Sequence, residues 1–464
     1  MIIEGIINDR KNLFWTFMHV GLGILCTLTP FALIAWFYFI FITNISKAVA
    51  LLKNGMPAFF ILLFSYLVSF EVLDRMAKTS PFIPYEMGKY LLVLMGLLGV
   101  LTLGVRSQKG IWMAILVTPA IFYDFSGQRV FYDLINYYLA PLAVGLGVAF
   151  ADRLSISKNQ LNQILKLVWL GCLSSLVFTY VKTPELENIS FDLKANFDTT
   201  GGHSSNQVST ILGLGMFLSF YSVFNKLKFS GNRALDIIIL AGFTFQGLLS
   251  FSRGGMLVGV LAILILIFLP DSKRQALYTI PSKKPIILAL FSLLMLYGIF
   301  NATNNITGGN LLLRYQGETQ GTLLGNKERT LNQFSSGRID IFQKDLALWG
   351  EYILTGVGCG VSRYLRDSDN YAVAAHIELS RLLADHGILG LAFSMIFFSI
   401  PYQKWRINNN ESQRTILFIL LIFGVITTFH AAMRTFVTPL FMIIGSLKIS
   451  EPIITNKNLN AKVI

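Results

Sequence analysis

The sequence predicts an all-α polytopic membrane protein, with about 12 to 14 transmembrane helices and one large extracytoplasmic loop containing short amphipathic helices. Of its 464 residues, 54% are hydrophobic and only 14% are charged, whereas a soluble domain has roughly 25% charged residues. Apolar runs recur from one end of the chain to the other, and a spanning helix needs about 20 such residues. Only residues 304–386 interrupt this pattern with a long and charged segment.

The apolar runs divide the chain into three parts. Residues 1–303 form the first part of a helical bundle, 304–386 form the loop, and 387–464 form the last helices and a cytoplasmic tail. The predicted helices are 13–28, 30–45, 56–73, 86–103, 110–124, 130–150, 162–182, 205–224, 234–251, 254–270, 285–303, 387–403, 415–430 and 434–449. The first two are joined at Thr29-Pro30, where two short helices or one long kinked helix are both consistent with the sequence.

The net charge of +13 sets the expected orientation in the membrane. Lys and Arg lie in short clusters between apolar runs, which is typical of topology signals and lipid headgroup contacts and unlike a basic patch for nucleic acid. The cations expected in cytoplasmic loops are Lys47, Lys53, Arg106, Lys109, Arg153, Lys158, Lys226, Lys228, Arg233, Lys273, Arg274, Lys283, Lys284, Lys404, Arg406 and Arg414. Both termini are therefore expected in the cytoplasm and residues 304–386 outside it.

The long loop is expected to have its own structure, because connections of about 80 residues are rare in compact proteins. Within it, SSGRIDIFQKDLALWGEYIL predicts an amphipathic helix that Ser335 or Ser336 can cap. Its apolar residues recur at three- and four-residue steps: Ile339, Phe342, Leu346 and Trp349. Such a helix can lie on the bilayer surface or roof a cavity between the spans.

The first candidate for chemistry is His376 in AAHIELSRLLADHGILG. Residues 374–386 predict a helix that ends at Gly387 and places His376, Ser380 and Leu383 on one face. An imidazole can act as a general base near neutral pH, which suits deprotonation of a sugar hydroxyl. The alternative is a hydrogen-bonded histidine at the membrane interface. His386, at the helix end, is expected to have a capping role.

The second candidate is Arg253 in the segment Ser252-Arg253-Gly254-Gly255, between two apolar runs. An arginine within the membrane costs about 2.5–3.5 kcal/mol at a helix centre and less near the interface, so it usually faces the protein or a polar cavity. The glycines leave room for a ligand, and a guanidinium suits bidentate phosphate binding. The alternative is a side chain that extends to the lipid headgroups.

The third candidate is the loop set Arg314, Arg338 and Asp340. Arg338 falls in the first turn of the predicted helix, where the helix dipole disfavours a cation, so a bound anion would explain it. The alternative is a solvated arginine, with Asp340 as its partner.

Other charged or glycine-rich segments are given ordinary structural roles. Gly356-Val-Gly358-Cys-Gly360 lacks the strand and the acidic partner of a nucleotide site and predicts a turn. Glu71 and Arg75 are spaced for an ion pair, and His430 with Arg434 are further membrane-embedded candidates. The three cysteines show no metal-ligand spacing, so no metal or other cofactor is expected.

Three segments in this order resemble the O-antigen ligase and O-antigen polymerase superfamily of bacterial membrane glycosyltransferases: LLSFSRGGMLVGVLAILIL, SSGRIDIFQKDLALWGEYILTGVGCG and AHIELSRLLADHGILGLAFS. ANFDTTGGHSSNQVST and RYQGETQGT resemble polymerase-type members. The resemblance covers about residues 195–403. The chain departs from the family at Ile377, because the family often has Asn after this histidine.

The resemblance implies an enzyme in the bacterial inner membrane that acts at its periplasmic face, without metal or nucleotide. It would transfer a glycan from undecaprenyl pyrophosphate to a hydroxyl, either of a second lipid-linked glycan or of a lipid A core. By position, Arg253 and Arg338 match pyrophosphate ligands, Arg314 is a looser match with Asp340 beside the set, and His376 matches the histidine that activates or orients the acceptor.

Polymerisation is the expected reaction and ligation to the lipid A core is the alternative. A polysaccharide flippase is the alternative from another class, because it would also be polytopic but would place polar groups near the middle of the membrane.

Overall fold

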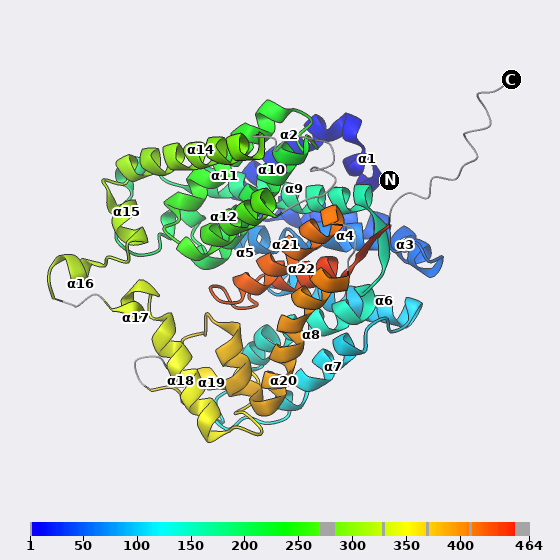
Figure 1. Ribbon diagram of the computed structural model, residues 1–464, viewed down its shortest axis with the longest axis vertical. Coiled ribbons are helices and arrows are strands. Elements are labelled where there is room, and N and C mark those ends of the chain that lie inside the picture. Colours follow the sequence, from blue (N-terminus) through cyan, green and yellow to red (C-terminus); the bar gives the residue numbers. More distant parts are fainter. Residues whose placement is uncertain (1, 270–283, 327–329, 368–370, 408–410, 451–464) are drawn as a thin grey trace.

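The computed structural model describes residues 2–269, 284–326, 330–367, 371–407 and 411–450. Within these ranges the chain is mostly helical, and its two short strands form one parallel pair (Figure 1). Five helices are long and apolar enough to cross a membrane: Phe31–Lys53, Phe131–Ala151, Lys158–Lys182, Ser205–Asn225 and Glu378–Arg406. Their length and composition indicate a membrane protein. Lys273, Arg274, Lys283 and the tail beyond Ser450, which the sequence analysis assigned to the cytoplasm, lie outside the described residues.

Most helices of the bundle overlap the expected apolar segments; α1, before the first of them, was not expected. In the first half they are α1 Ile2–Ile7, α2 Asn12–Leu28, α3 Phe31–Lys53, α4 Ala58–Val68, α5 Glu71–Ala77, α6 Met87–Leu103, α7 Gln108–Val117, α8 Phe131–Ala151 and α9 Lys158–Lys182. In the second half they are α10 Ser205–Asn225, α11 Arg233–Leu249, α12 Arg253–Phe268, α14 Lys284–Ile306, α20 Glu378–Ile407, α21 Glu411–Thr427 and α22 Val437–Ser446. The strands are β1 Ser155–Ser157 and β2 Lys448–Ser450.

Short helices fill the loop and the connections. The loop contains α15 Asn310–Tyr315, α16 Gln320–Leu323, α17 Leu331–Phe334, α18 Arg338–Glu351 and α19 Ser362–Leu365, along the left and lower-left edge of Figure 1. Turns of 3₁₀ helix are η1 Asp9–Lys11, η2 Pro119–Ile121, η3 Leu186–Asn188 and η4 Asp198–Thr200. A helix is present where the sequence predicts it, as α18, but the expected apolar face is wrong. Ile339, Phe342, Leu346 and Trp349 are half-buried, and the buried side chains are those of Ile341, Asp345 and Leu348.

Some expected helix boundaries need correction. The chain breaks at Thr29-Pro30, so α2 and α3 are two helices. Residues 56–73 are not one helix, because α4 ends where the Ser69 hydroxyl donates to the carbonyl of Tyr66 at 2.6 Å. Hydroxyls that bond to nearby backbone in this way compete with the helical pattern. Residues 110–124 contain the short helix α7 followed by the 3₁₀ turn η2, and residues 434–449 contain the short helix α22.

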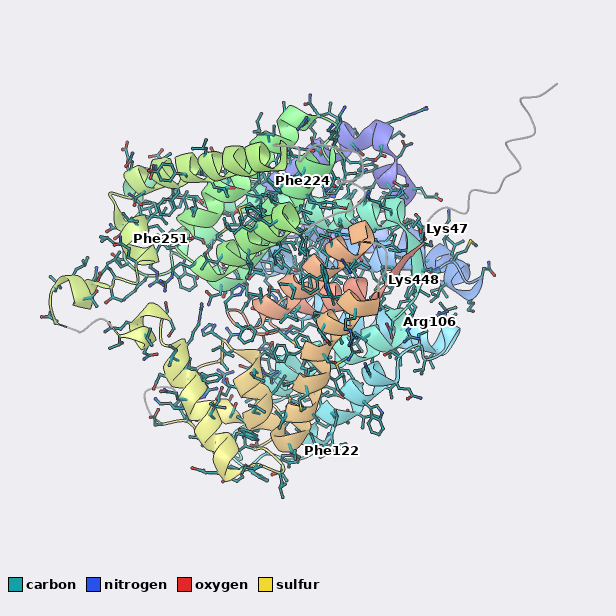
Figure 2. All side chains as sticks on the ribbon, viewed as in Figure 1. Lys47, Arg106, Phe122, Phe224, Phe251 and Lys448 are labelled. Atoms are coloured by element: carbon teal, nitrogen blue, oxygen red, sulfur yellow. The ribbon has the colours of Figure 1, made fainter. Side chains whose placement is uncertain are left out.

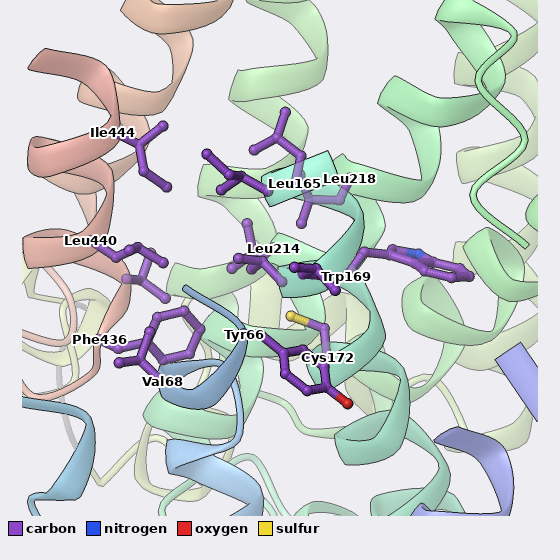
Figure 3. Packing of buried hydrophobic residues seen from close by; sticks show 14 of the residues in the cluster. Tyr66, Val68, Leu165, Trp169, Cys172, Leu214, Leu218, Phe436, Leu440 and Ile444 are labelled. Atoms are coloured by element: carbon purple, nitrogen blue, oxygen red, sulfur yellow. The ribbon is translucent and has the colours of Figure 1, made fainter. Parts of the chain in front are cut away.

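The core of the bundle is centred on α9 and α10. Figure 3 shows Trp169 and Cys172 of α9 beside Leu214 of α10 and Leu440 of α22, and all four side chains are fully buried. The indole nitrogen of Trp169 donates to the hydroxyl of Ser219 at 2.8 Å. This satisfies the only polar atom of the Trp169 side chain, as burial requires.

Glycines allow α7 and α8 to approach each other closely. A Cβ atom added at Gly110 would lie 2.2 Å from the backbone nitrogen of Ala149, and one added at Gly145 would lie 2.6 Å from that of Ala114. Small residues at helix contacts are typical of membrane bundles, where close packing replaces the hydrophobic effect.

Replacing Gly110 with alanine is therefore expected to lower the melting temperature of the purified protein, because overpacking costs typically about 1–3 kcal/mol. Gly21→Ala in α2 is the matched control, because a Cβ atom there meets nothing within 4 Å. It should maintain or raise the melting temperature, since alanine favours a helix over glycine by about 1 kcal/mol. Equal melting temperatures for the two variants would contradict the close packing of α7 on α8.

The helix α20 reverses its direction at Gly387, which has a φ of 59° and a ψ of −135°. A Cβ atom added at Gly390 would lie 1.9 Å from the carbonyl oxygen of Leu382. In a straight helix these residues would be about 12 Å apart along the axis. Residues 378–386 therefore fold back on the segment that follows Gly387.

Candidate functional site

Four arginines from four separate elements face one region at the loop end of the bundle. Arg253 is the first residue of α12, Arg314 lies on α15, Arg338 is the first residue of α18, and Arg434 lies between α21 and α22. Hydrogen bonds bring these elements together: Arg253 and Arg314 both donate to the hydroxyl of Ser336, at 3.4 and 3.2 Å, and Arg434 donates at 2.6 Å to the carbonyl of Ala375, next to His376. Arg253 and Arg338 thus occupy the positions that the sequence analysis expected, at the starts of two helices.

Asn206, near the start of α10, joins this arginine cluster to His376. Its side-chain oxygen accepts from Nη2 of Arg338 at 3.2 Å and from the hydroxyl of Ser252 at 3.0 Å. Its Nδ2 lies 3.4 Å from Nδ1 of His376. Asn206 was not among the expected site residues, although it lies in the segment ANFDTTGGHSSNQVST.

The contacts of Asn206 select a tautomer for His376. Because the Asn206 oxygen faces Arg338 and Ser252, its NH₂ group faces the histidine and acts as the donor to Nδ1. In a neutral imidazole one nitrogen accepts and the other donates, so the proton lies on Nε2. His376 in this arrangement presents an N–H donor from Nε2, and its lone pair faces Asn206.

His376 precedes helix α20, which begins at Glu378. The expectation of a helix from residue 374, with His376 on one of its faces, is wrong. The connection between α21 and α22 holds this segment out of the helix: the amide of Ala432 donates to the carbonyl of His376 at 3.0 Å, and the amide of Glu378 donates to the carbonyl of Thr428 at 2.9 Å. His376 is therefore fixed by tertiary backbone hydrogen bonds.

Burial and neighbouring cations control the charges of the site. Burial, followed by the charges of Arg434 and Arg338, lowers the pKa of His376 to about 3, so its imidazole is neutral at physiological pH. Burial, followed by the charges of Arg253 and Arg434, lowers the pKa of Arg338 to about 10. Burial, followed by the charges of Arg253 and Arg338, also lowers the pKa of Arg314 to about 10. A bound anion would reverse these shifts, because it favours the charged form of each arginine.

Three other arginines of the loop form ion pairs with carboxylates. Arg366 contacts the buried Asp345 at 2.7 Å, Arg363 contacts Asp133 at 2.8 Å, and Arg381 contacts Asp385 at 2.9 Å. Arg314 and Arg338, by contrast, form no ion pair with any residue in the described ranges. These two cations thus meet uncharged acceptors and other cations.

Asp340 forms an ion pair with Lys344 at 2.9 Å, one turn along α18. The alternative in which Asp340 pairs with Arg338 is wrong. The carboxylate of Asp340 is directed to the half-buried Lys344, and Arg338 has no carboxylate partner within the described part of the chain. Asp340 as a contact of the substrate stays a prediction.

Arg314 also has a structural role, because its guanidinium binds the main chain. It donates to the carbonyl of Leu193 at 3.0 Å and to the hydroxyl of Ser336 at 3.2 Å. Arg253 donates to the carbonyl of Arg314 at 3.0 Å and reaches the same Ser336 hydroxyl at 3.4 Å. Of the two serines expected to cap α18, Ser335 accepts from the first-turn amide of Ile339 at 3.2 Å, whereas Ser336 is a shared acceptor of two arginines; Gly337 holds the N-cap position itself.

A buried ion-pair network connects elements that carry residues of the site. Arg75 contacts Glu71 at 2.8 Å, which confirms the expected i,i+4 pair, and it also donates to the side chain of Gln207 at 2.6 Å and to the carbonyl of Arg434 at 2.9 Å. It therefore links α5 to the start of α10 and to the connection that contains Arg434.

The glycine-rich segment 356–360 is a turn, as expected, and it packs against the reversal of α20. Asp385 accepts hydrogen bonds from the backbone amides of Gly360 at 2.9 Å and Ser362 at 3.1 Å. A Cβ atom at Gly356 would lie 2.5 Å from the amide of Gly387, so this position requires glycine. The turn thus fixes the helical segment that follows His376.

The chain has no match among models of known protein families, and no curated protein matches it. Within the described residues, no group of three or more His, Cys, Asp or Glu side chains could hold a metal ion. The groups that the site presents to a ligand are guanidinium N–H donors, an amide and an imidazole. This set is suited to an anion that lies beside a hydroxyl.

Proposed function

We propose that the protein transfers a glycan from undecaprenyl pyrophosphate to a hydroxyl acceptor at the extracytoplasmic face of the bacterial inner membrane, in the polymerisation of O-antigen or a related surface polysaccharide. The observation that carries the proposal is the convergence of Arg253, Arg314, Arg338 and Arg434 beside His376, linked through Asn206. Transfer of this kind needs a cationic site for the leaving group next to a polar group for the acceptor.

The reaction breaks the bond between the sugar carbon and the pyrophosphate oxygen and forms a bond from that carbon to the acceptor oxygen. The leaving pyrophosphate gains negative charge, which Arg338 and Arg253 are placed to stabilise as preorganised donors. The acceptor hydroxyl loses its proton. His376 can orient the hydroxyl through Nε2–H. It can take the proton, when the hydroxyl replaces Asn206 at Nδ1, only if the bound pyrophosphate offsets the arginine charges that lower the pKa of His376.

Transport of the lipid-linked glycan has less support. A transporter is expected to have discontinuous helices around polar groups near the centre of the membrane. The α4–α5 break is of this form, but its charged residues Glu71 and Arg75 pair with each other. Arg314 and Arg338, which form no ion pair within the described residues, lie instead on loop helices beside the bundle.

Deletion of the gene in its native strain tests the proposal, with the surface glycans separated by size. We expect single repeat units on the lipid A core, because loss of a polymerase leaves ligation intact. Bare core with accumulated lipid-linked polymer would instead identify a ligase, and repeat units trapped at the cytoplasmic face would identify a flippase. An unchanged size distribution of the surface glycans would contradict the polymerase, ligase and flippase assignments alike.

A further inference from the structure

A second cationic site lies at the other end of the bundle. A cavity of about 940 Å³ opens between the start of α7, the α8–β1 connection, the end of α20 and strand β2. Its charged lining residues are Arg106, Lys109, Asp152, Arg153, Lys404 and Lys448. Figure 2 shows Arg106 and Lys448 on the same side of the molecule, across the bundle from Phe251 next to the arginine cluster.

The length of α8 separates this cavity from the candidate active site. Asp133 in the first turn of α8 binds Arg363 of the loop, whereas Asp152, just after its last residue, lines the cavity. The 21 residues of α8 span about 30 Å, which is the thickness of the hydrocarbon core of a bilayer. The cavity therefore lies at the opposite membrane interface and is independent of the proposed glycan transfer.

Most of the positive charge in this cavity has no acidic partner. The single carboxylate of the lining, Asp152, forms an ion pair with Lys404 at 2.6 Å. Lys109 donates to the side chain of Gln403. Arg106, Arg153 and Lys448 are exposed, and within the described ranges none of their side chains forms an ion pair.

The backbone holds these three cations in fixed positions around the opening. The amide of Arg106 donates to the carbonyl of Ala149 at 2.8 Å, and that of Arg153 to the carbonyl of Ser446 at 3.1 Å. The amide of Lys448 donates to the carbonyl of Leu154 at 2.8 Å, beside the parallel pairing of β1 with β2. Cations in cytoplasmic loops are expected from topology alone, but topology does not require segments 106, 153 and 448 to be bonded around one cavity.

We propose that this cavity binds a phosphate-bearing anion, of the kind carried by an acidic phospholipid headgroup or by a soluble phosphoryl compound. Guanidinium groups bind phosphate oxygens in pairs, and the cavity volume is in the range of small-molecule sites. Its level at the end of the spanning helices is the level of lipid headgroups, where each cation contributes about 1 kcal/mol of attraction to an acidic lipid.

The test compares two triple variants of the full-length protein in detergent. Arg106→Gln/Arg153→Gln/Lys448→Gln removes the unpaired cations of the cavity. Lys53→Gln/Lys158→Gln/Lys226→Gln removes the same charge from exposed lysines outside the lining. Native mass spectrometry with added cardiolipin, and with phosphatidylcholine as the uncharged control, measures the lipid arm. Calorimetric titration with inorganic pyrophosphate measures the soluble arm.

We expect the cavity variant to lose at least about tenfold in affinity for cardiolipin or for pyrophosphate, relative to both the control variant and the unaltered protein. Loss in the first arm identifies a headgroup site, and loss in the second identifies a soluble phosphoryl ligand. Equal affinities of the two triple variants in both arms would overturn the proposal. The single variant Lys448→Gln should also bind the same ligand more weakly than the unaltered protein. Its fold should be unchanged, because the backbone pairing of β2 does not depend on this side chain.

Discussion

Replacing His376 with alanine is expected to lower the rate of glycan transfer by roughly 10²–10⁴-fold, which is the usual contribution of a positioned acid–base group. The protein should remain in the membrane with its fold intact, because His376 lies in a connection and its backbone carbonyl, rather than its ring, accepts from Ala432. Transfer is measured with purified protein, lipid-linked donor and acceptor. His203→Ala is the matched control, since His203 is half-buried just before α10 and its ring lies 3.4 Å from the side chain of Gln207.

The glutamine variant of His376 separates the two roles of the imidazole. A glutamine amide can donate a hydrogen bond but cannot take a proton at neutral pH. If His376 orients the acceptor through Nε2–H, His376→Gln should retain clearly more activity than His376→Ala. If His376 is the base, the two variants should be equally inactive. Full activity of His376→Ala would remove the histidine from the mechanism.

Replacing Arg338 with alanine is expected to lower the transfer rate by about 10²–10³-fold, the size of effect found when one preorganised donor to a developing negative charge is removed. Arg338→Lys should recover only part of the rate, because lysine keeps the charge but cannot bond to Asn206 and to pyrophosphate in the same forked geometry. The variants are compared by kcat/KM for the donor and by inhibition with free undecaprenyl pyrophosphate.

Lys344→Ala is the matched control for Arg338, because it removes a cation from the same helix at a position where two carboxylates surround it. It should transfer glycan at the normal rate. Inhibition by undecaprenyl pyrophosphate that is equally strong in Arg338→Ala and in the unaltered protein would show that the arginine does not bind the leaving group. That outcome would leave the arginine cluster without its proposed ligand.

Apolar runs predict the helices of this protein well because spanning segments need many consecutive apolar residues, whatever they pack against. The internal breaks are less visible in such runs. Pro119 follows the end of α7, and the prediction of one helix over residues 110–124 did not take this proline into account. The break at Ser69 depends on a hydroxyl bonding to its own helix, and the reversal at Gly387 depends on the turn at Gly356. Neither has a periodic signature.

The candidate site could be predicted only in part. Arg253 and Arg338 stand out in the sequence because a cation at a helix start needs an explanation. Asn206 has no such signal, since it reaches His376 across 170 positions of the chain. Ser336 was seen as a cap because local spacing is all that the sequence offers, and its contacts with Arg253 and Arg314 come from the fold of the loop.

Because the arginines of the site come from four elements, one anion bound among them would connect segments that are far apart in the sequence. Ser336 and Asn206 are uncharged, so they connect like charges without neutralising them. A pyrophosphate bound among Arg253, Arg338 and Arg434 would supply that neutralisation and hold α12, α18 and the α21–α22 connection together. Ligands that bind only the folded arrangement stabilise it in proportion to their occupancy. The donor would thus stabilise the arrangement of its own binding site. Release of the product would remove that stabilisation before the next glycan binds.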